Sequence, residues 1–228
     1  MLVLAIDTST PAVTAAVGEV GDGGAPALLA QRVTVDARRH GELLTPSIEA
    51  VLSESGCAPG DLAAVVAGVG PGPFTGLRIG LVSAAALADA LGLPTYGVCS
   101  LDAIAHAPAG MTARMPGGLL VATDARRREI YWAVYGPDGA RLVDPSVSRP
   151  ADVPVDGCVL ARGAGAQLYA DVLGLPVEEP AHPPALALIT LAAGRVSAGA
   201  PSEVLTPLYL RRPDATEPAL AKPALGPR

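Results

Sequence analysis

Blocks of hydrophobic and polar residues follow one another along the first half of the chain and predict an α/β protein. Short apolar runs rich in branched residues indicate buried strands, and apolar residues three or four positions apart indicate helices. Strands are expected at residues 2–7, 12–20, 28–34, 63–69 and 94–98, and helices at 40–55, 77–91 and 100–106. This order favours three strands in a meander followed by two parallel strands that are reached by helical crossovers.

The second half has a looser pattern, which predicts a smaller second lobe. Residues 119–125 and 129–136 are expected to form an antiparallel pair, and Pro137-Asp138-Gly139 is a turn signal before a further strand. A strand is expected at 158–162, helices at 166–173 and 184–197, and a closing segment at 204–211. The predicted organisation is a first lobe at 1–106, a second lobe at 107–212 that begins with a linker rich in Pro and Gly, and a disordered tail at 213–228.

Composition and charge exclude several classes of protein. Half of the 228 residues are hydrophobic, 17% are charged, and the net charge is −6, so the chain is neither disordered nor a basic binder of nucleic acid or anionic membranes. The apolar run at the N-terminus is too short for a signal peptide or a membrane span. Three widely spaced cysteines without a CxxC pair predict reduced thiols and a cytoplasmic protein.

The residue types needed for most catalytic mechanisms are missing or scattered. Lys222 is the single lysine, and there is no Walker phosphate loop and no G-x-S-x-G nucleophile motif. His40, His106 and His182 are far apart, and no spacing places two of them on one helical face. We therefore expect no catalytic residue and no metal site.

Asp7, Thr8 and Ser9 follow the first expected strand and have two interpretations. A carboxylate and hydroxyls at the end of a strand can face a nucleotide phosphate or its metal. The alternative is an Asx or Ser/Thr turn that fixes the hairpin.

A Gly-rich loop lies between the fourth expected strand and the next helix, which is where phosphate cradles occur. The prolines at positions 71 and 73 each remove a backbone N–H that a phosphate would need, and no acidic residue ends the following strand, so dinucleotide binding is disfavoured. The alternative is a rigid structural loop that lets the helix pack close to the sheet. The residues of this loop are Gly70, Pro71, Gly72, Phe74, Thr75 and Gly76.

Three consecutive arginines lie between Asp124 and Glu129. They have the charge to contact RNA phosphates, but an exposed hairpin tip with an acid at each end is the simpler interpretation.

Five segments together resemble the TsaB (YeaZ) family, which functions in bacterial tRNA threonylcarbamoyladenosine synthesis. They are AIDTST, RRHGELLTPSIEAVL, GVGPGPFTGLRIGL, DARRREIYWAVY and PLYLR, in this order from residue 1 to about 211. The resemblance implies the two-lobed α/β fold of actin, Hsp70 and sugar kinases, with a shortened second lobe. It also implies a non-catalytic subunit with no cofactor of its own.

The same resemblance implies partners. TsaD, which carries a two-histidine metal motif, would transfer threonylcarbamoyl to adenosine 37 of ANN-decoding tRNAs. The matching helix here begins at His40 and has no second histidine four residues later. TsaE, an ATPase, would bind at the junction, where ATP or ADP could also bind. Contact with tRNA would be indirect, and no membrane is implied.

The interface with TsaD is expected on two helices of the first lobe, which carry more apolar residues than one sheet face needs. In the absence of TsaD the same face is expected to form a homodimer. An alternative from another class is a self-sufficient nucleotide-dependent transferase or kinase of the same fold. The expected interface residues are His40, Leu43, Leu44, Ile48, Val51, Leu52, Leu77, Leu81, Ala84, Ala85 and Ala88.

Overall fold

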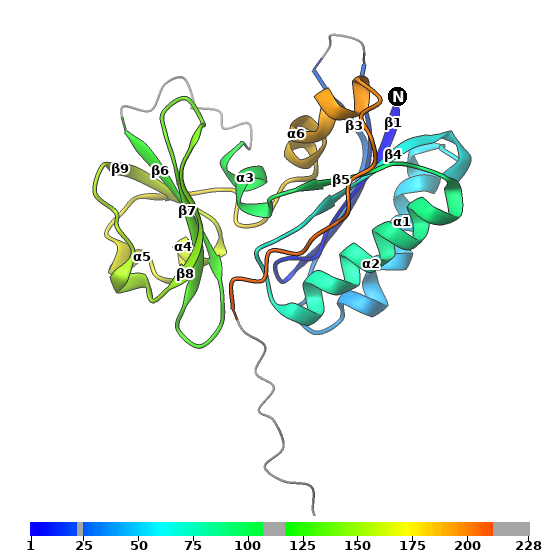
Figure 1. The fold of residues 1–228 in the computed structure, drawn as a ribbon. Helices are drawn as coiled ribbons and strands as arrows, with labels where there is room; N and C mark the ends of the chain where they lie inside the picture. Colours follow the sequence, from blue (N-terminus) through cyan, green and yellow to red (C-terminus); the bar gives the residue numbers. More distant parts are fainter. Residues whose placement is uncertain (22–24, 107–116, 212–228) are drawn as a thin grey trace, which may run out of the picture.

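The computed structural model describes residues 1–21, 25–106 and 117–211. The tail predicted from residue 213 and most of the predicted linker at 107–118 lie outside these residues. Within them the chain forms two lobes that lie side by side (Figure 1).

The first lobe is built on one five-stranded sheet. Its elements are β1 (Leu2–Asp7), β2 (Ala12–Glu19), β3 (Ala27–Val35), α1 (His40–Ser55), η1 (Pro59–Asp61), β4 (Leu62–Gly68), α2 (Phe74–Leu91), β5 (Thr95–Val98) and α3 (Ser100–Ala105). The sheet order is β3-β2-β1-β4-β5. The first three strands are antiparallel, and β4 and β5 continue the sheet in parallel, so the predicted meander and parallel crossovers are confirmed.

The second lobe repeats this pattern with smaller connections. Its elements are β6 (Gly118–Asp124), β7 (Ile130–Tyr135), β8 (Arg141–Ser148), η2 (Pro150–Asp152), β9 (Cys158–Arg162), α4 (Ala164–Leu168), α5 (Ala170–Leu173), β10 (Val177–Glu178) and α6 (Ala185–Ser197). The sheet order is β10-β9-β6-β7-β8, again with three antiparallel strands and two parallel ones. The two mixed sheets have one topology, and the second has a 3-10 turn where the first has α1. They confirm the predicted actin/Hsp70/sugar-kinase-like fold with a shortened second lobe.

The helices that follow the last strand of each sheet pack on the opposite lobe. α3 lies against β6 and β7, and its Leu101 and Ile104 join the core of the second lobe. α6 lies against β1, β4 and β5, where Leu188 and Ile189 cover the inner face of the first sheet. Both helices lie between the two sheets (Figure 1). The sequence assigned α6 to the second lobe, but it packs on the sheet of the first.

α1 and α2 cover the outer face of the first sheet, away from the second lobe (Figure 1). Both end at a glycine in the left-handed region, Gly56 at φ 70° and Gly92 at φ 67°, which satisfies the last carbonyls of each helix. α2 begins at Phe74, directly after the extended Pro73, and is therefore three residues longer than the pattern predicts. Two elements differ in the second lobe: the helix expected at 166–173 is divided at Tyr169, and the two-residue strand β10 was not expected.

Candidate functional site

The turn after β1 is held together by its own carboxylate. Asp7 Oδ1 accepts hydrogen bonds from the backbone N–H and the hydroxyl of Ser9, at 2.9 and 2.8 Å, and Oδ2 accepts one from the Ser100 hydroxyl at 2.6 Å. Asp7 and Ser9 are each 1% exposed. Burial raises the pKa of Asp7, although hydrogen bonds from Ser100 and Ser9 oppose that rise. The hydrogen bonds are those of the expected turn, and the side chains of Asp7 and Ser9 are enclosed by protein.

Thr8 joins this turn to α2. Its hydroxyl donates to the carbonyl of Gly76 at 2.7 Å and accepts from the N–H of Gly80 at 3.0 Å, so it lies between two groups that an ordinary helix would pair directly. A Cβ atom at Gly80 would overlap this hydroxyl. Glycine is therefore required here by close packing between the turn and the helix.

The Gly-rich loop is filled by the same turn. A Cβ atom at Gly72 would overlap the Ser9 carbonyl, and one at Gly76 would lie 3.0 Å from the Thr8 carbonyl. Gly70 has a φ of 91°, and its N–H donates to the Ser100 hydroxyl at 3.2 Å. The turn after β1 thus packs directly against the glycines of this loop, as the structural interpretation of the loop expects.

A pocket of about 330 Å³ opens beside the loop, between the two lobes. Thr8 borders it from the turn, while Asp124 and Arg126 reach it from the second lobe. His40 is 7% exposed and its Nε2 lies 2.8 Å from the Thr10 carbonyl, so this side chain is anchored in the lobe and is not a solvated helix start. The pocket is lined by Thr8, Thr10, Pro11, Ala37, Arg38, His40, Pro73, Phe74, Thr75, Gly76, Ile79, Asp124 and Arg126.

The three arginines form the tip of the β6–β7 hairpin. β6 and β7 pair from Asp124 with Ile130, which confirms the predicted hairpin. Arg126, Arg127 and Arg128 have φ values of 63°, 54° and 62°, in the left-handed region that costs roughly 1–2 kcal/mol per residue outside glycine. The Asp124 carboxylate accepts from the Arg126 N–H at 2.9 Å and stabilises this turn.

Most of the predicted interface residues lie inside the first lobe. Their side chains fill the core between the sheet and the two helices, which is why they recur with helical spacing. Leu43 and Ile48 are half-buried, and Ala85 alone is exposed. The predicted interface is therefore corrected: the following residues are between 0% and 9% exposed and belong to the core or, for His40, to its edge. They are His40, Leu44, Val51, Leu52, Leu77, Leu81, Ala84 and Ala88.

Exposed apolar residues lie instead on the outer face of α2 and on the segment that follows α6, among other places. Only 28% of the residues of α2 are buried, although its composition is apolar enough for a membrane span by length and hydropathy alone; here it packs on β1, β4 and β5 in a globular fold. Phe74 and Val82 are 42% and 61% exposed, and Val204 and Tyr209 are 90% and 39% exposed.

Val82, Val204 and Tyr209 line one groove, together with Arg78 and Ala85. It has a volume of about 480 Å³ between α2 and residues 204–209. The rings of Phe74 and Tyr209 lie 5.0 Å apart, and the Arg78 guanidinium lies 5.0 Å above the Phe74 ring. We call this the α2 surface and define it by Phe74, Arg78, Val82, Ala85, Val204 and Tyr209.

Comparisons with known proteins identify relatives of this chain. A family model described as TsaD, tRNA N6-adenosine threonylcarbamoyltransferase, matches residues 28–163. The Escherichia coli K12 tRNA threonylcarbamoyladenosine biosynthesis protein TsaB is 31% identical over 183 residues, 75% of each chain.

The chain belongs to the TsaB (YeaZ) family.

Two further similarities cover nearly the whole chain. An uncharacterized protein of Mycobacterium tuberculosis H37Rv is 52% identical over 213 residues, 93% of each chain. The solved structure of YeaZ from Pseudomonas aeruginosa superimposes with a TM-score of 0.74 at 28% identity, covering 92% of this chain and 99% of the other. The TsaB (YeaZ) family membership therefore applies to both lobes.

Within the residues described, no three His, Cys, Asp or Glu side chains come close enough together to hold a metal ion. Among these described residues, His40 at the start of α1 belongs to no such cluster. It contacts a backbone carbonyl in this member of the TsaB (YeaZ) family.

Sequence reasoning missed the residues that form the α2 surface, apart from Ala85. Val82 follows Leu81 in a helix in which most residues are apolar, so hydropathy alone does not distinguish its inner and outer faces. A comparison with α1 could have identified them. The exposed positions Glu42, Thr45 and Glu49 of α1 are polar, as expected for a helix face in contact with water. By that standard, α2 carries apolar residues where a solvated face would be polar.

Proposed function

We propose that this chain is a non-catalytic accessory subunit in the synthesis of tRNA threonylcarbamoyladenosine. The observation that carries the proposal is the 31% identity to E. coli TsaB across three quarters of both chains. Fold alone would not carry it, because one fold serves many functions.

Two features of the chain support an accessory role. Asp7 is enclosed by Ser9 and Ser100, and the Gly-rich loop is filled by the turn after β1. The parts that a kinase-like enzyme would use to hold a phosphate are thus packed against one another. Any ATP or ADP would bind at the junction of the complex, near the pocket between the lobes.

The proposed partner of the α2 surface is a TsaD-type homologue. Exposed apolar surface that is continuous over a helix and an adjoining segment usually marks a protein contact. Ala85 and Ala86 are small and exposed, which lets a partner helix approach closely. With its partner absent, the same surface would pair two copies of this chain. A TsaE-type ATPase would bind at the junction, tRNA would be held mainly by the partner, and the complex would be cytoplasmic.

The experiment uses a matched pair of substitutions. Val82→Asp places a carboxylate in the α2 surface, and Val172→Asp places one on α5 of the second lobe, where the valine is similarly exposed, at 54% against 61%. Burying an unpaired carboxylate in a contact costs several kcal/mol, enough to dissociate a micromolar complex.

Association is measured by gel filtration with light scattering, and modified nucleoside is measured in digested tRNA from a reconstituted reaction. We expect Val82→Asp to abolish both and Val172→Asp to leave both intact. A Val82→Asp variant that associates normally would place the partner elsewhere.

The alternative, a self-sufficient nucleotide-dependent transferase or kinase, is tested by the same purified chain. Turnover of ATP or modification of tRNA by the chain alone, at rates comparable to those with the partner, would favour the alternative over an accessory role.

A further inference from the structure

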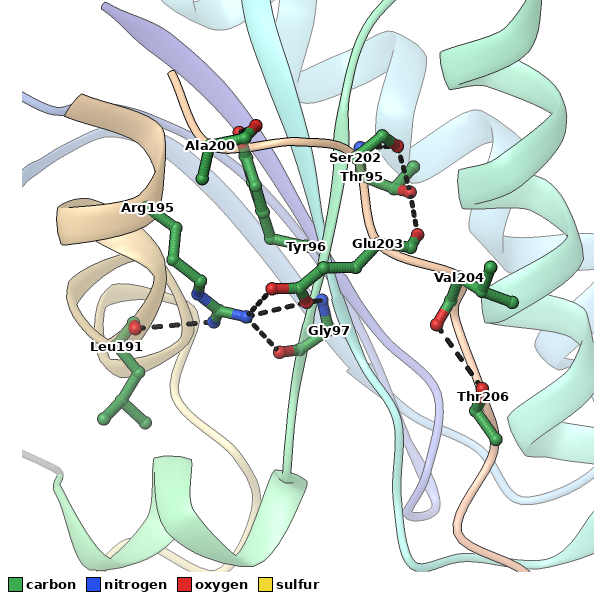
Figure 2. Close-up of polar contacts among 10 residues, drawn as sticks. All are labelled: Thr95, Tyr96, Gly97, Leu191, Arg195, Ala200, Ser202, Glu203, Val204 and Thr206. Atoms are coloured by element: carbon green, nitrogen blue, oxygen red, sulfur yellow. Dashed lines mark hydrogen bonds and ion pairs between the residues drawn. The ribbon is translucent and has the colours of Figure 1, made fainter. Parts of the chain in front are cut away.

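Residues 200–211, which we call the closing segment, run along the free edge of β5 in place of a sixth strand. The Glu203 N–H donates to the Thr95 carbonyl at 2.8 Å, and the Thr95 N–H donates to the Ser202 hydroxyl at 3.0 Å. The Gly97 N–H donates to the Glu203 carboxylate at 3.0 Å (Figure 2). The edge amides of β5 are thus satisfied largely by side chains.

One arginine holds the start of the closing segment in place. Arg195, in the last turn of α6, donates to the Glu203 carboxylate at 2.8 Å and to the Gly97 carbonyl at 3.0 Å (Figure 2). Burial raises the pKa of Glu203, but the hydrogen bonds from Arg195 and Gly97 and the charge of Arg195 outweigh it, so the pKa is lowered. The start of the closing segment is therefore tied to both α6 and β5.

The middle of the closing segment belongs to the α2 surface. The Leu208 N–H donates to the Val69 carbonyl at 2.9 Å, which fixes the backbone beside the end of β4. On either side of this bond, Leu205, Pro207 and Tyr209 line the groove against α2. Anything that covers the α2 surface must touch this part of the chain.

The end of the closing segment crosses to the second lobe. Arg211 Nη1 donates to the Ala125 carbonyl at 2.8 Å, and Nη2 lies 3.4 Å from the Glu129 carboxylate. Both groups belong to the tip of the β6–β7 hairpin, which has three consecutive residues in the left-handed region and supplies Arg126 to the wall of the interlobe pocket.

We propose that the closing segment is a latch that joins the α2 surface to the hairpin tip, with Arg211 as its positioning residue. The identity of the partner on the α2 surface rests on the proposed function, whereas the latch itself does not. Only one residue, Leu210, separates Tyr209 from Arg211, so a partner that orders Tyr209 also orders the contact that holds the tip. A partner that covers the α2 surface therefore also restricts the hairpin tip, which forms the second-lobe wall of the interlobe pocket.

The first test needs only the full chain. Hydrogen exchange is measured at the Ala125 and Glu129 amides, which close the tip by donating to the Glu129 and Arg126 carbonyls, each at 3.0 Å. We expect Arg211→Gln to speed exchange at both amides about tenfold and Glu129→Gln to speed it less, because the bond to Ala125 remains. Arg149→Gln, an exposed arginine of the second lobe, is the matched control and should leave the rates unchanged. Unchanged rates in Arg211→Gln would overturn the latch.

The second test adds the TsaD-type homologue. With the native chain, we expect slower exchange in both α2 and the hairpin tip. With Arg211→Gln, protection should remain in α2 and disappear from the tip; protection of the tip in that variant would overturn the coupling. If α2 is not protected in the native chain, the proposed docking fails, and the first test alone decides the latch.

Discussion

Replacing Gly80 by alanine tests how tightly the turn after β1 is joined to α2. The substitution adds one methyl group in a helix, where alanine is ordinarily the better residue by about 0.5–1 kcal/mol. At this position the methyl group would overlap the Thr8 hydroxyl, which bridges Gly76 and Gly80.

The magnitude follows from three contributions. Overpacking a close contact costs about 1–3 kcal/mol. Displacing the hydroxyl loses two hydrogen bonds at about 1 kcal/mol each, and the helix recovers part of this by pairing Gly76 with residue 80 directly. After the gain in helix propensity is subtracted, we expect Gly80→Ala to lower the free energy of unfolding by about 2 kcal/mol.

The free energy of unfolding is measured by urea denaturation, and two comparisons show whether the loss comes from the overlap with Thr8. Gly194→Ala is the control, because Gly194 lies in α6 and a Cβ atom there meets nothing within 4 Å; it should raise stability by about 0.5–1 kcal/mol. In the Thr8→Ala background the overlap with the hydroxyl is gone, so Gly80→Ala should cost less than 1 kcal/mol there. Equal costs of Gly80→Ala in both backgrounds would refute the reasoning.

Three further predictions concern ionisable groups. Burial raises the pKa of Asp7 above its ordinary 3.8, so the free energy of unfolding should fall as the pH rises from 3.8 through the raised value. Urea denaturation across this pH range should show that Asp7→Asn removes the slope and is at least as stable as the native chain at pH 7. A large loss of stability in Asp7→Asn at pH 7 would contradict this prediction. The pKa of Glu203 is lowered from 4.5, so the ionised carboxylate stabilises the fold above pH 4.5, and this stabilisation is lost as the pH falls through the lower value. In the same assay, Glu203→Gln should be less stable than the native chain at pH 7, and the difference should disappear below pH 4.5. Burial raises the pKa of Cys99 to about 11, so at pH 8 its alkylation should be roughly a hundredfold slower than that of an ordinary thiol. Mass spectrometry of the folded chain after alkylation measures this rate, and rapid labelling of Cys99 would count against its burial.

The order of elements was predictable because each one has a local cause. Apolar runs mark the strands, Gly56 and Gly92 end the long helices, and the sequence from Asp124 to Glu129 marks a hairpin tip. The two-residue strand β10 was not predictable, because its pairing with β9 comes from tertiary structure and leaves no periodicity in the sequence.

The surface residues were harder to predict because α2 carries large apolar residues on both its buried and its exposed face. Leu81 is 5% exposed and its neighbour Val82 is 61% exposed, yet both are large aliphatic residues. The direction of the helix relative to the sheet separates them, and that direction is set by Thr8 contacting Gly76 and Gly80. The closing segment was recognised as ordered, but its path beside β5 depends on Glu203 finding Arg195, a contact between elements whose positions the sequence does not reveal.

The exchange of α3 and α6 between the lobes has a consequence for how the chain is made. The inner face of the first sheet is complete in sequence when Val98 emerges from the ribosome, but the helix that covers it ends at Ser197. At a synthesis rate of about 5–20 residues per second, this apolar face stays uncovered for roughly 5–20 seconds. The lobe that is synthesised first is therefore the last to have its core completed, because that core needs a helix from near the end of the described chain.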